Sequence, residues 1–581
     1  MTADRRAFLS GAIAAAGAVC AAPGARLPNI LWITCEDIGP HLGAFGCADS
    51  RTPHLDRLAG KGMRFPFVWS NAPVCAPART AILTGMYPQS LGAQHMRSLV
   101  PFAAGLLSYP EHLRLAGYYC TNNAKTDYNL AVQPAEIWNE SSAKAHWKNR
   151  AEGQPFFAVF NLEMTHESQI RRRPHVWVHD PAKVRIPAYH PDNEDTRKDW
   201  AQYHDQISEM DARAGELLRE VEAAGLTGDT VVFFFGDNGP GLPRNKRDGY
   251  NAGLHVPLIV YLPEKWKSLA AGWWAPGKAV NRLVEFVDLA PTVLSIAGRK
   301  APANFQGRAF LGVHASAGPE FLFGMMDRMG ERYDLIRTVR DRRYVYLRNF
   351  MPHRPHGPAG EYGMQTPTTR VWKALYDAGK LRGPQRGYWE PKEAEELYDL
   401  ENDGDEVKNL AGSAAHGAVL TRFRAALREH VLRIRDTGFL PENELHERSR
   451  GTTPWEMARD GRRYPLERIF GAADAASRPE AGAMARLLGL AEDADSAVRY
   501  WGVMGILMRG RDAVRQARMV LVRRLEDDAA AVRIVAAEAL ARYGEDGDAA
   551  KAMDVLVSHI DPRKNSLTVV IAAMNSLDAA G

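Results

Sequence analysis

Short hydrophobic runs, each ended by polar positions, recur along the first half of the chain. The first, Asn29–Thr34, ends at Cys35-Glu36-Asp37, and similar runs span 156–162, 230–235 and 256–262. Their hydrophobicity is continuous rather than alternating, which is typical of strands that are buried on both faces of a parallel sheet. These runs therefore predict buried strands, and the first and third of them end at acidic residues.

Helical patterns separate these runs. The segment 52–62 begins with Thr-Pro, which suits the start of a helix, and a longer helical pattern covers 200–224. Strands that alternate with helices predict an α/β fold with a mostly parallel sheet sandwiched by helices. In such sheets ligands gather outside the carboxyl ends of the strands, which is where Glu36-Asp37 and Asp237-Asn238 fall.

The pattern changes after about residue 315. Strand-like pieces such as 343–347 and one long helical pattern at 418–435 predict a smaller α+β subdomain over 316–445. The polar, arginine-rich stretch that follows predicts a linker over 446–474.

The final segment, 475–581, contains an internal repeat. Two acidic stretches, 493–499 and 526–533, each end in Val-Arg and precede an apolar helical pattern, and they lie about 34 residues apart. This period is typical of stacked helical pairs and resembles short HEAT-type repeats, with a simple helical bundle as the alternative. We expect these helices to pack against the catalytic domain or a partner protein.

The N-terminus has the pattern of an export signal. Arg5-Arg6 precedes a short Ala/Gly-rich apolar stretch over 11–22, which predicts a twin-arginine signal over 1–26 and a periplasmic or extracellular location. The apolar stretch is short for a transmembrane span. A membrane-anchoring or unstructured start is the alternative, and lipidation at Cys20 is disfavoured because Val19 is large for the position before it.

Composition changes this picture little. The 581 residues are 45% hydrophobic and 24% charged, with a formal net charge of +4, which does not indicate a nucleic-acid partner. The five cysteines have no Cys-x-x-Cys spacing, which disfavours a zinc or redox motif. Cys35, Cys47 and Cys120 are expected to be plain buried thiols.

Two features carry candidate chemistry. Glu36-Asp37 and Asp237-Asn238 offer oxygen donors at two strand ends, and such donors suit Ca²⁺, or Mg²⁺, better than zinc. Cys75 opens a predicted helix with Pro77 in its first turn and Arg79 one turn along. A helix N-terminus favours an oxyanion, so this segment fits either an activated nucleophile or a cysteine that is simply packed.

The run Cys75-x-Pro77-x-Arg79, followed by Thr84-Gly85, resembles the core signature of type I sulfatases, in which this Cys is converted to formylglycine. Similar patterns extend over 28–257 and resume at 396–410. The resemblance implies an alkaline-phosphatase-like catalytic domain over 27–315. It also implies a maturation partner, either a formylglycine-generating enzyme or an anaerobic sulfatase-maturating enzyme.

The same resemblance implies roles for individual residues. One hydroxyl of the hydrated aldehyde would attack sulfur, and the other would then expel sulfate. A bound cation would polarise the sulfate group. The implied metal ligands are Glu36, Asp37, Asp237 and Asn238, with residue 75 completing the shell; the implied catalytic residues are Cys75, Arg79, Lys125, His166 as the general acid, and Lys246.

Two positions depart from the family pattern. Glu36 stands where the family usually has Asp, and its extra methylene shifts the geometry of the ligand. Lys125-Thr126-Asp127 stands where many sulfatases have Lys-x-His. Asp127 would replace the missing His, bind substrate, or do neither.

Other segments resemble bacterial relatives of the heparan N-sulfatase branch, which acts on sulfated sugars. These are 35–38, 92–98 and 121–123. The expected sugar-binding residues are His95, Arg97, Asp127, Arg328 and Arg332. Packing, a surface position or a salt-bridged loop are the alternatives for most of these side chains. Neither the glycan nor the choice of N- or O-sulfate follows from the sequence.

Three other functions compete with a sulfatase. The fold and the formylglycine also occur in phosphoester and phosphonate monoester hydrolases. A protein that binds sulfated glycans without turnover would keep an unprocessed Cys75. A thiol enzyme would use Cys75 directly as the nucleophile.

Overall fold

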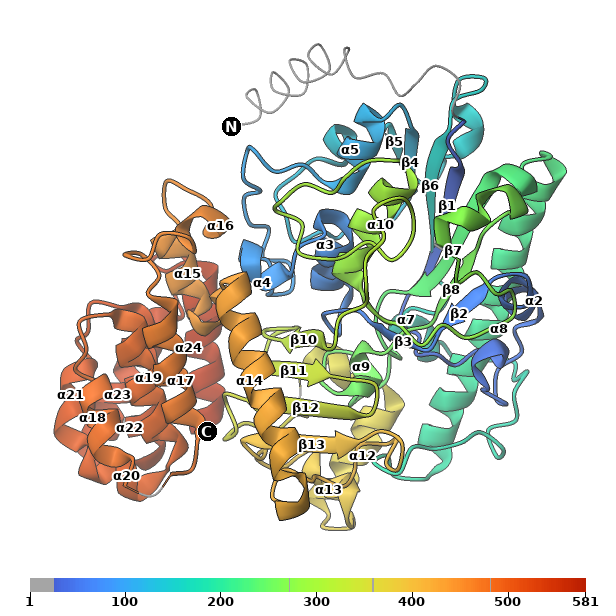
Figure 1. Ribbon diagram of the computed structural model, residues 1–581. Helices are drawn as coiled ribbons and strands as arrows, with labels where there is room; N and C mark the ends of the chain where they lie inside the picture. Colours follow the sequence, from blue (N-terminus) through green and yellow to red (C-terminus); the bar gives the residue numbers. More distant parts are fainter. Residues whose placement is uncertain (1–25, 271, 358–359, 481) are drawn as a thin grey trace.

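The computed structural model describes residues 26–270, 272–357, 360–480 and 482–581 (Figure 1). Apart from Arg26, the predicted export signal lies outside these residues. None of the described helices is both long and apolar enough to span a membrane.

A seven-stranded sheet forms the centre of the catalytic domain, in the order β2-β8-β7-β1-β6-β4-β5. The five strands from β7 to β5 run parallel, as predicted, whereas β8 runs antiparallel to both of its neighbours. A separate parallel pair is made by β3 and β9. The strands are β1 Asn29–Cys35, β2 Met63–Phe65, β3 Phe67–Trp69, β4 Tyr119–Asn123, β5 Glu140–Ser141, β6 Phe156–Leu162, β7 Thr230–Gly236, β8 Leu258–Tyr261 and β9 Leu283–Glu285.

Helices cover both faces of this sheet (Figure 1). On β1, Ile30 and Trp32 belong to one hydrophobic core with α3, α5 and α10, whereas Leu31 and Ile33 belong to another with α2 and α8. Burial on both faces explains why this run is continuously hydrophobic. The helices are α2 Pro53–Lys61, α3 Cys75–Thr84, α4 Pro88–Leu91, α5 Tyr109–Leu115, α6 Pro134–Ile137, α7 Glu167–Ile170, α8 Glu194–Ala223, α9 Asn251–Leu254 and α10 Leu289–Ile296.

Residues 316–445 contain a four-stranded antiparallel sheet in the order β10-β11-β12-β13, with α14 packed against it. Arg337 on β11 is fully buried and pairs with Asp327 and Asp436 at 2.8 and 2.6 Å. The elements are β10 Leu322–Met326, β11 Ile336–Arg340, β12 Tyr344–Asn349, β13 Glu395–Asp399, α11 Glu361–Met364, α12 Pro367–Asp377, α13 Pro384–Gly387 and α14 Gly417–Ile434.

The segment expected to be a linker, 446–474, is folded and packed. It holds the end of α15 (Glu442–Arg448), all of α16 (Pro454–Met457) and most of α17 (Leu466–Ser477). Met457 and Tyr464 are buried in the core that α14 and the tail share. The many arginines of this segment give it the composition of a linker, although a few apolar residues anchor it in the core.

A layer of short helices completes the chain beside α14 (Figure 1). The repeated Arg residues make matching contacts: Arg499 donates to the carbonyl oxygens of Asp493 and Ala494, and Arg533 donates to those of Asp527 and Asp528. The two repeats therefore share one local structure. The helices are α18 Met484–Leu490, α19 Ser496–Met508, α20 Arg511–Gln516, α21 Arg518–Arg524, α22 Ala530–Tyr543, α23 Asp546–His559 and α24 Leu567–Ala580.

Candidate active site

The carboxyl ends of β1, β6 and β7 meet at one edge of the central sheet. In the parallel register, Cys35 of β1 lies opposite Leu162 of β6 and Gly236 of β7. The residues that follow these three strands are therefore neighbours, although about 200 positions separate Glu36-Asp37 from Asp237-Asn238.

The polar groups at this edge are buried and bonded to one another. The backbone N–H of Asp37 donates to Asp237 Oδ1 at 3.1 Å, and Asn238 Nδ2 donates to Asp37 Oδ1 at 2.9 Å. Burial raises the pKa of Asp237 to about 6, although Arg79 acts to lower it. Ionised carboxylates that are buried this close together need compensating positive charge.

Cys75 is the first residue of α3 and lies against this cluster. Its Sγ and one carboxylate oxygen each from Glu36 and Asp237 lie within 4.8 Å of one another, and Cys75 is only 3% exposed. Burial raises the pKa of the Cys75 thiol; Lys246 acts to lower that pKa, and the nearby carboxylates act to raise it. These surroundings do not activate an unmodified thiol, because the reactive form is the thiolate.

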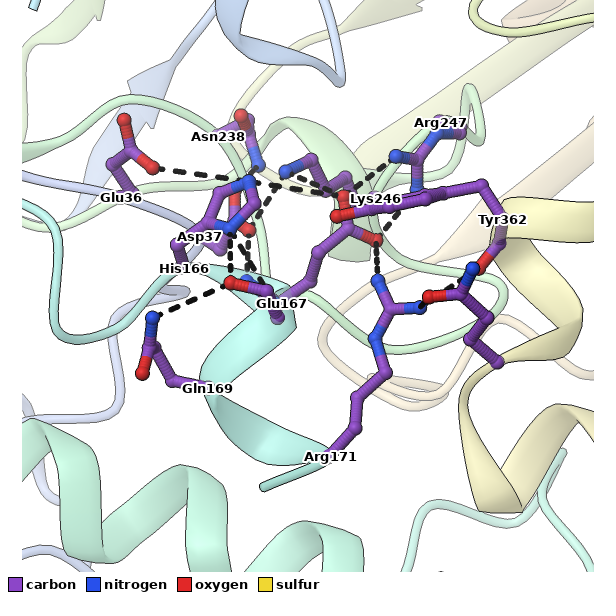
Figure 2. Close-up of polar contacts among 12 residues, drawn as sticks. Glu36, Asp37, His166, Glu167, Gln169, Arg171, Asn238, Lys246, Arg247 and Tyr362 are labelled. Carbon is purple, nitrogen blue, oxygen red and sulfur yellow. Dashed lines mark hydrogen bonds and ion pairs between the residues drawn. The ribbon is translucent and has the colours of Figure 1, made fainter.

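Three cations surround the carboxylates. Arg79 donates to Asp237 Oδ2 at 3.0 Å, and Lys125 Nζ lies 2.5 Å from Glu36 Oε1. Lys246 Nζ lies 2.7 Å from Asp37 Oδ2 (Figure 2). Burial acts to lower the pKa of Lys246, but the negative groups around it hold that pKa well above its usual range. All three side chains therefore stay charged, and charged N–H donors of this kind bind oxyanions.

His166 follows β6 and caps α7. Its Nδ1 accepts a hydrogen bond from the backbone N–H of Ser168 at 3.3 Å, so the neutral ring carries its proton on Nε2. That Nε2 lies 3.9 Å from Glu36 Oε2. Burial lowers the pKa of His166. The structure therefore presents an N–H of His166 to the same centre as Cys75 and the three cations.

The donor set fits a hard divalent cation. Glu36, Asp37, Asp237 and Asn238 supply oxygen ligands, and each is at most 1% exposed. The Oδ1 atom of Asn238 is buried and has no hydrogen-bond partner among the described residues. A buried acceptor left in this way costs free energy, and a cation bound between the two strand ends would satisfy it.

Sequence reasoning missed two residues of this centre. Glu167 bonds Lys246 at 2.9 Å and forms a bidentate pair with Arg247, and its own N–H donates to Asp37 Oδ2 at 2.7 Å (Figure 2). Asn161 on β6 accepts from Arg79 Nη1 at 2.7 Å. The sequence does contain features that could have indicated both residues. Glu167 directly follows His166, and Asn161 is a polar residue within a hydrophobic run.

A cavity of about 710 Å³ opens over this centre. Four of the five predicted catalytic residues line it, namely Cys75, Lys125, His166 and Lys246. Among the predicted sugar-binding residues, those that also line the cavity are Arg97, Asp127 and Arg332.

His95 and Arg328 lie behind the cavity wall. His95 is fully buried, and burial lowers its pKa to about 4. Arg328 forms a two-pronged pair with Glu442 of α15, at 2.6 and 2.7 Å. These side chains stabilise the wall instead of facing a ligand, because the Arg328 guanidinium is paired with Glu442. The sequence did not indicate this partner.

The model of the family described as sulfatase matches residues 28–130 and 119–299. An ulvan-active sulfatase of Formosa agariphila is 37% identical over 469 residues, which cover 72% of this chain and 77% of the relative. Human N-sulphoglucosamine sulphohydrolase is 25% identical over 459 residues, covering 69% and 89%.

Solved structures show the same fold. A phosphonate monoester hydrolase from Silicibacter pomeroyi superposes with a TM-score of 0.52 at 19% identity, covering 71% of this chain and 97% of that one. A 2-O GAG sulfatase superposes with a TM-score of 0.51 at 18% identity, covering 71% and 93%. Structural similarity at this level of sequence identity supports the fold alone, whereas the similarity in sequence establishes the family. The chain belongs to the type I sulfatases of the alkaline phosphatase superfamily.

Proposed function

We propose that this chain hydrolyses sulfate esters or sulfamates of a sulfated carbohydrate. The observation that carries the proposal is the placement of Cys75, at a helix N-terminus, beside three carboxylates and three cations in the lining of a cavity. The names of the relatives, an ulvan-active sulfatase and an N-sulphoglucosamine sulphohydrolase, support a sulfated glycan as the substrate class.

Residue 75 acts after conversion to formylglycine by a maturation enzyme, and its hydrate supplies the hydroxyl group that attacks sulfur. Glu36, Asp37, Asp237 and Asn238 hold Ca²⁺ or Mg²⁺, which supplies positive charge for the sulfate oxygens. The buried, unpartnered Oδ1 of Asn238 supports such a site.

The chain's own side chains bind and orient the substrate. Lys125 and Lys246 now contact carboxylates, and they offer charged N–H donors to the oxygens of a bound sulfate group. Arg79 is fixed by Asn161 and Asp237, which holds its guanidinium next to residue 75. His166 donates its Nε2 proton to the oxygen or nitrogen that leaves sulfur.

Mass spectrometry of the peptide containing residue 75 tests the chemistry. The protein is produced with a formylglycine-generating enzyme, and sulfate release is measured from 4-nitrophenyl sulfate and from ulvan oligosaccharides. We expect formylglycine at residue 75 and no turnover by Cys75→Ala. An unmodified cysteine in active enzyme, or a preference for aryl phosphates or phosphonates over aryl sulfates, would overturn the proposal.

We further propose twin-arginine export of the chain and a HEAT-type repeat in its tail. Arg5-Arg6 supports the first, and the matching contacts of Arg499 and Arg533 support the second. Replacing both arginines of the signal by lysine should keep the protein in the cytoplasmic fraction of its host. Unchanged export would argue against this route.

A further inference from the structure

Part of the wall of the active-site cavity is built by the helical tail. Glu538 and Arg542 of α22 and Asn575 and Asp578 of α24 line the same cavity as Cys75 and Lys125. The cavity therefore continues well beyond the groups that would hold a sulfate. Its volume of about 710 Å³ lies within the roughly 300–1,000 Å³ range of cavities that enclose a whole small ligand.

Hydrogen bonds tie the tail to the loop that borders the cavity. Asn575 accepts from the backbone N–H of Tyr333 at 3.1 Å and donates to the carbonyl oxygen of Glu331 at 2.9 Å. An ion pair joins Arg332 to Asp578. Asn575 is only 8% exposed. The tail is thus a fixed part of the cavity wall.

Two guanidinium groups share one carboxylate where α22 meets this wall. Arg354 and Arg542 share one carboxylate, Glu538, at long distances of 3.5 and 3.4 Å. Glu538 is 1% exposed, and its Oε2 already accepts a hydrogen bond from Ser576 at 2.8 Å. One buried carboxylate therefore faces two guanidinium groups.

Most donors of Arg542 remain free to bind a ligand. A guanidinium has five N–H donors, and within the described residues Arg542 makes only the one hydrogen bond to Glu538. Its side chain is 26% exposed, and it lines the cavity. Planar guanidinium groups bind carboxylates and other oxyanions with paired hydrogen bonds.

We propose that Arg542 and Arg354 form a second anion subsite, which binds a carboxylate or sulfate ester on a sugar adjoining the one that loses sulfate. This inference rests on the proposed function. It makes the helical tail a determinant of specificity: the enzyme selects oligosaccharides with at least two anionic groups over small monosulfates.

Kinetics of Arg542→Gln test this subsite with two substrates. A hydrogen bond to a charged group contributes about 1.5–3 kcal/mol, so kcat/KM for ulvan oligosaccharides should fall by roughly 10- to 150-fold. For 4-nitrophenyl sulfate, which carries a single anionic group, kcat/KM should stay within about twofold. The matched control is Arg523→Gln, a tail arginine paired with Glu492 outside the cavity, and it should change neither value.

Equal losses on both substrates, or no loss on either, would overturn the subsite. Carbodiimide reduction of the oligosaccharide carboxylates identifies the anion: if reduction removes the effect of Arg542→Gln, the subsite binds a carboxylate, and if the effect persists, it binds a sulfate ester.

Binding separates failure of the subsite from failure of the proposed activity. Calorimetry with Cys75→Ala protein needs no turnover, and adding Arg542→Gln should weaken the affinity for ulvan, heparan sulfate or chondroitin sulfate oligosaccharides by the same factor. No binding to any of the three, or equal affinity with and without Arg542, would refute the subsite. Binding without sulfate release by the mature enzyme would refute the proposed hydrolysis and leave the subsite standing.

Discussion

Asn238→Ala should remove most of the stabilisation that Ca²⁺ gives the protein. A ligand that binds only the folded state stabilises it by about 2.7 kcal/mol at a concentration of 100 times Kd. The substitution deletes a buried oxygen that has no other partner among the described residues. Even loss of a group that merely supports a metal ligand costs roughly 10- to 100-fold in affinity. A 100-fold loss would leave about 0.4 kcal/mol at the same concentration.

The assay compares thermal unfolding in EDTA and in Ca²⁺ for each protein. Only the increment produced by Ca²⁺ is used, because the substitution also removes the hydrogen bond from Asn238 to Asp37. Asn349→Ala is the matched control. Its Oδ1 is also buried and has no hydrogen-bond partner in the part of the chain that the structure describes, and its Nδ2 donates to Glu396 at 2.6 Å, far along the chain from the centre. We expect the full increment in that control. A full increment in Asn238→Ala, or a lost one in Asn349→Ala, would refute the reasoning.

Three further outcomes follow from the contacts. His166→Gln should lower kcat by about 10²- to 10⁴-fold for sulfated saccharides, and far less for 4-nitrophenyl sulfate, whose leaving group needs little protonation. Burial acts to raise the pKa of Glu442, yet His95 and Arg328 hold it at about 2, below its ordinary 4.5. A carboxyl group whose pKa is depressed by folding stabilises the fold above pH 4.5, and this stabilisation is lost as the pH falls towards 2. Glu442→Gln should therefore be less stable than the wild type by up to about 3 kcal/mol at pH 7. In acid unfolding titrations, the difference in stability between the two proteins should shrink as the pH falls. Arg337→Met leaves two buried carboxylates without their cation and should destabilise the protein by about 3–5 kcal/mol in urea unfolding.

Each of these outcomes has its own control. Equal losses on both substrates would show that His166 is not the proton donor. A stability difference that stays constant from pH 7 to pH 2 would contradict the charge pairing of Glu442. For Arg337→Met, the control is the surface variant Arg428→Met, which loses an exposed ion pair to Glu467 and a cation–π contact with Phe470. It should change stability by no more than about 2 kcal/mol. Similar values for the two variants would contradict the account of the buried pair.

The strands of the catalytic domain and one edge of the central sheet followed from the sequence. Continuous hydrophobicity at Asn29–Thr34 and 156–162 indicates strands that are buried on both faces, and the residues of each short run are enough to indicate this burial. Because parallel strands end at the same edge, Glu36-Asp37 and Asp237-Asn238 were expected near one another, and their side chains are in contact. The resemblance around Cys75 added an order of residues that no single motif provides.

The direction of β8 and the packing of 446–474 did not follow. A hydrophobic run indicates that a strand is buried, but not whether it runs parallel or antiparallel to its neighbour. In the expected linker, Met457 and Tyr464 anchor the chain in the core, although charged residues dominate the local composition. Hydrophobic periodicity is judged over a window of residues, so single buried apolar residues within a polar stretch are not detected by it.

What only the tertiary structure decided is which charges meet. Arg328 pairs with Glu442, 114 positions away, and Arg354 with Glu538, 184 positions away. Local sequence determines the burial and the type of each element, because side chains a few positions apart report the environment on either side of it. Partners that folding brings together leave no local pattern in the sequence. The helical tail was therefore recognisable as a repeat from its sequence alone, but its position in the wall of the active-site cavity could be seen only in the folded chain.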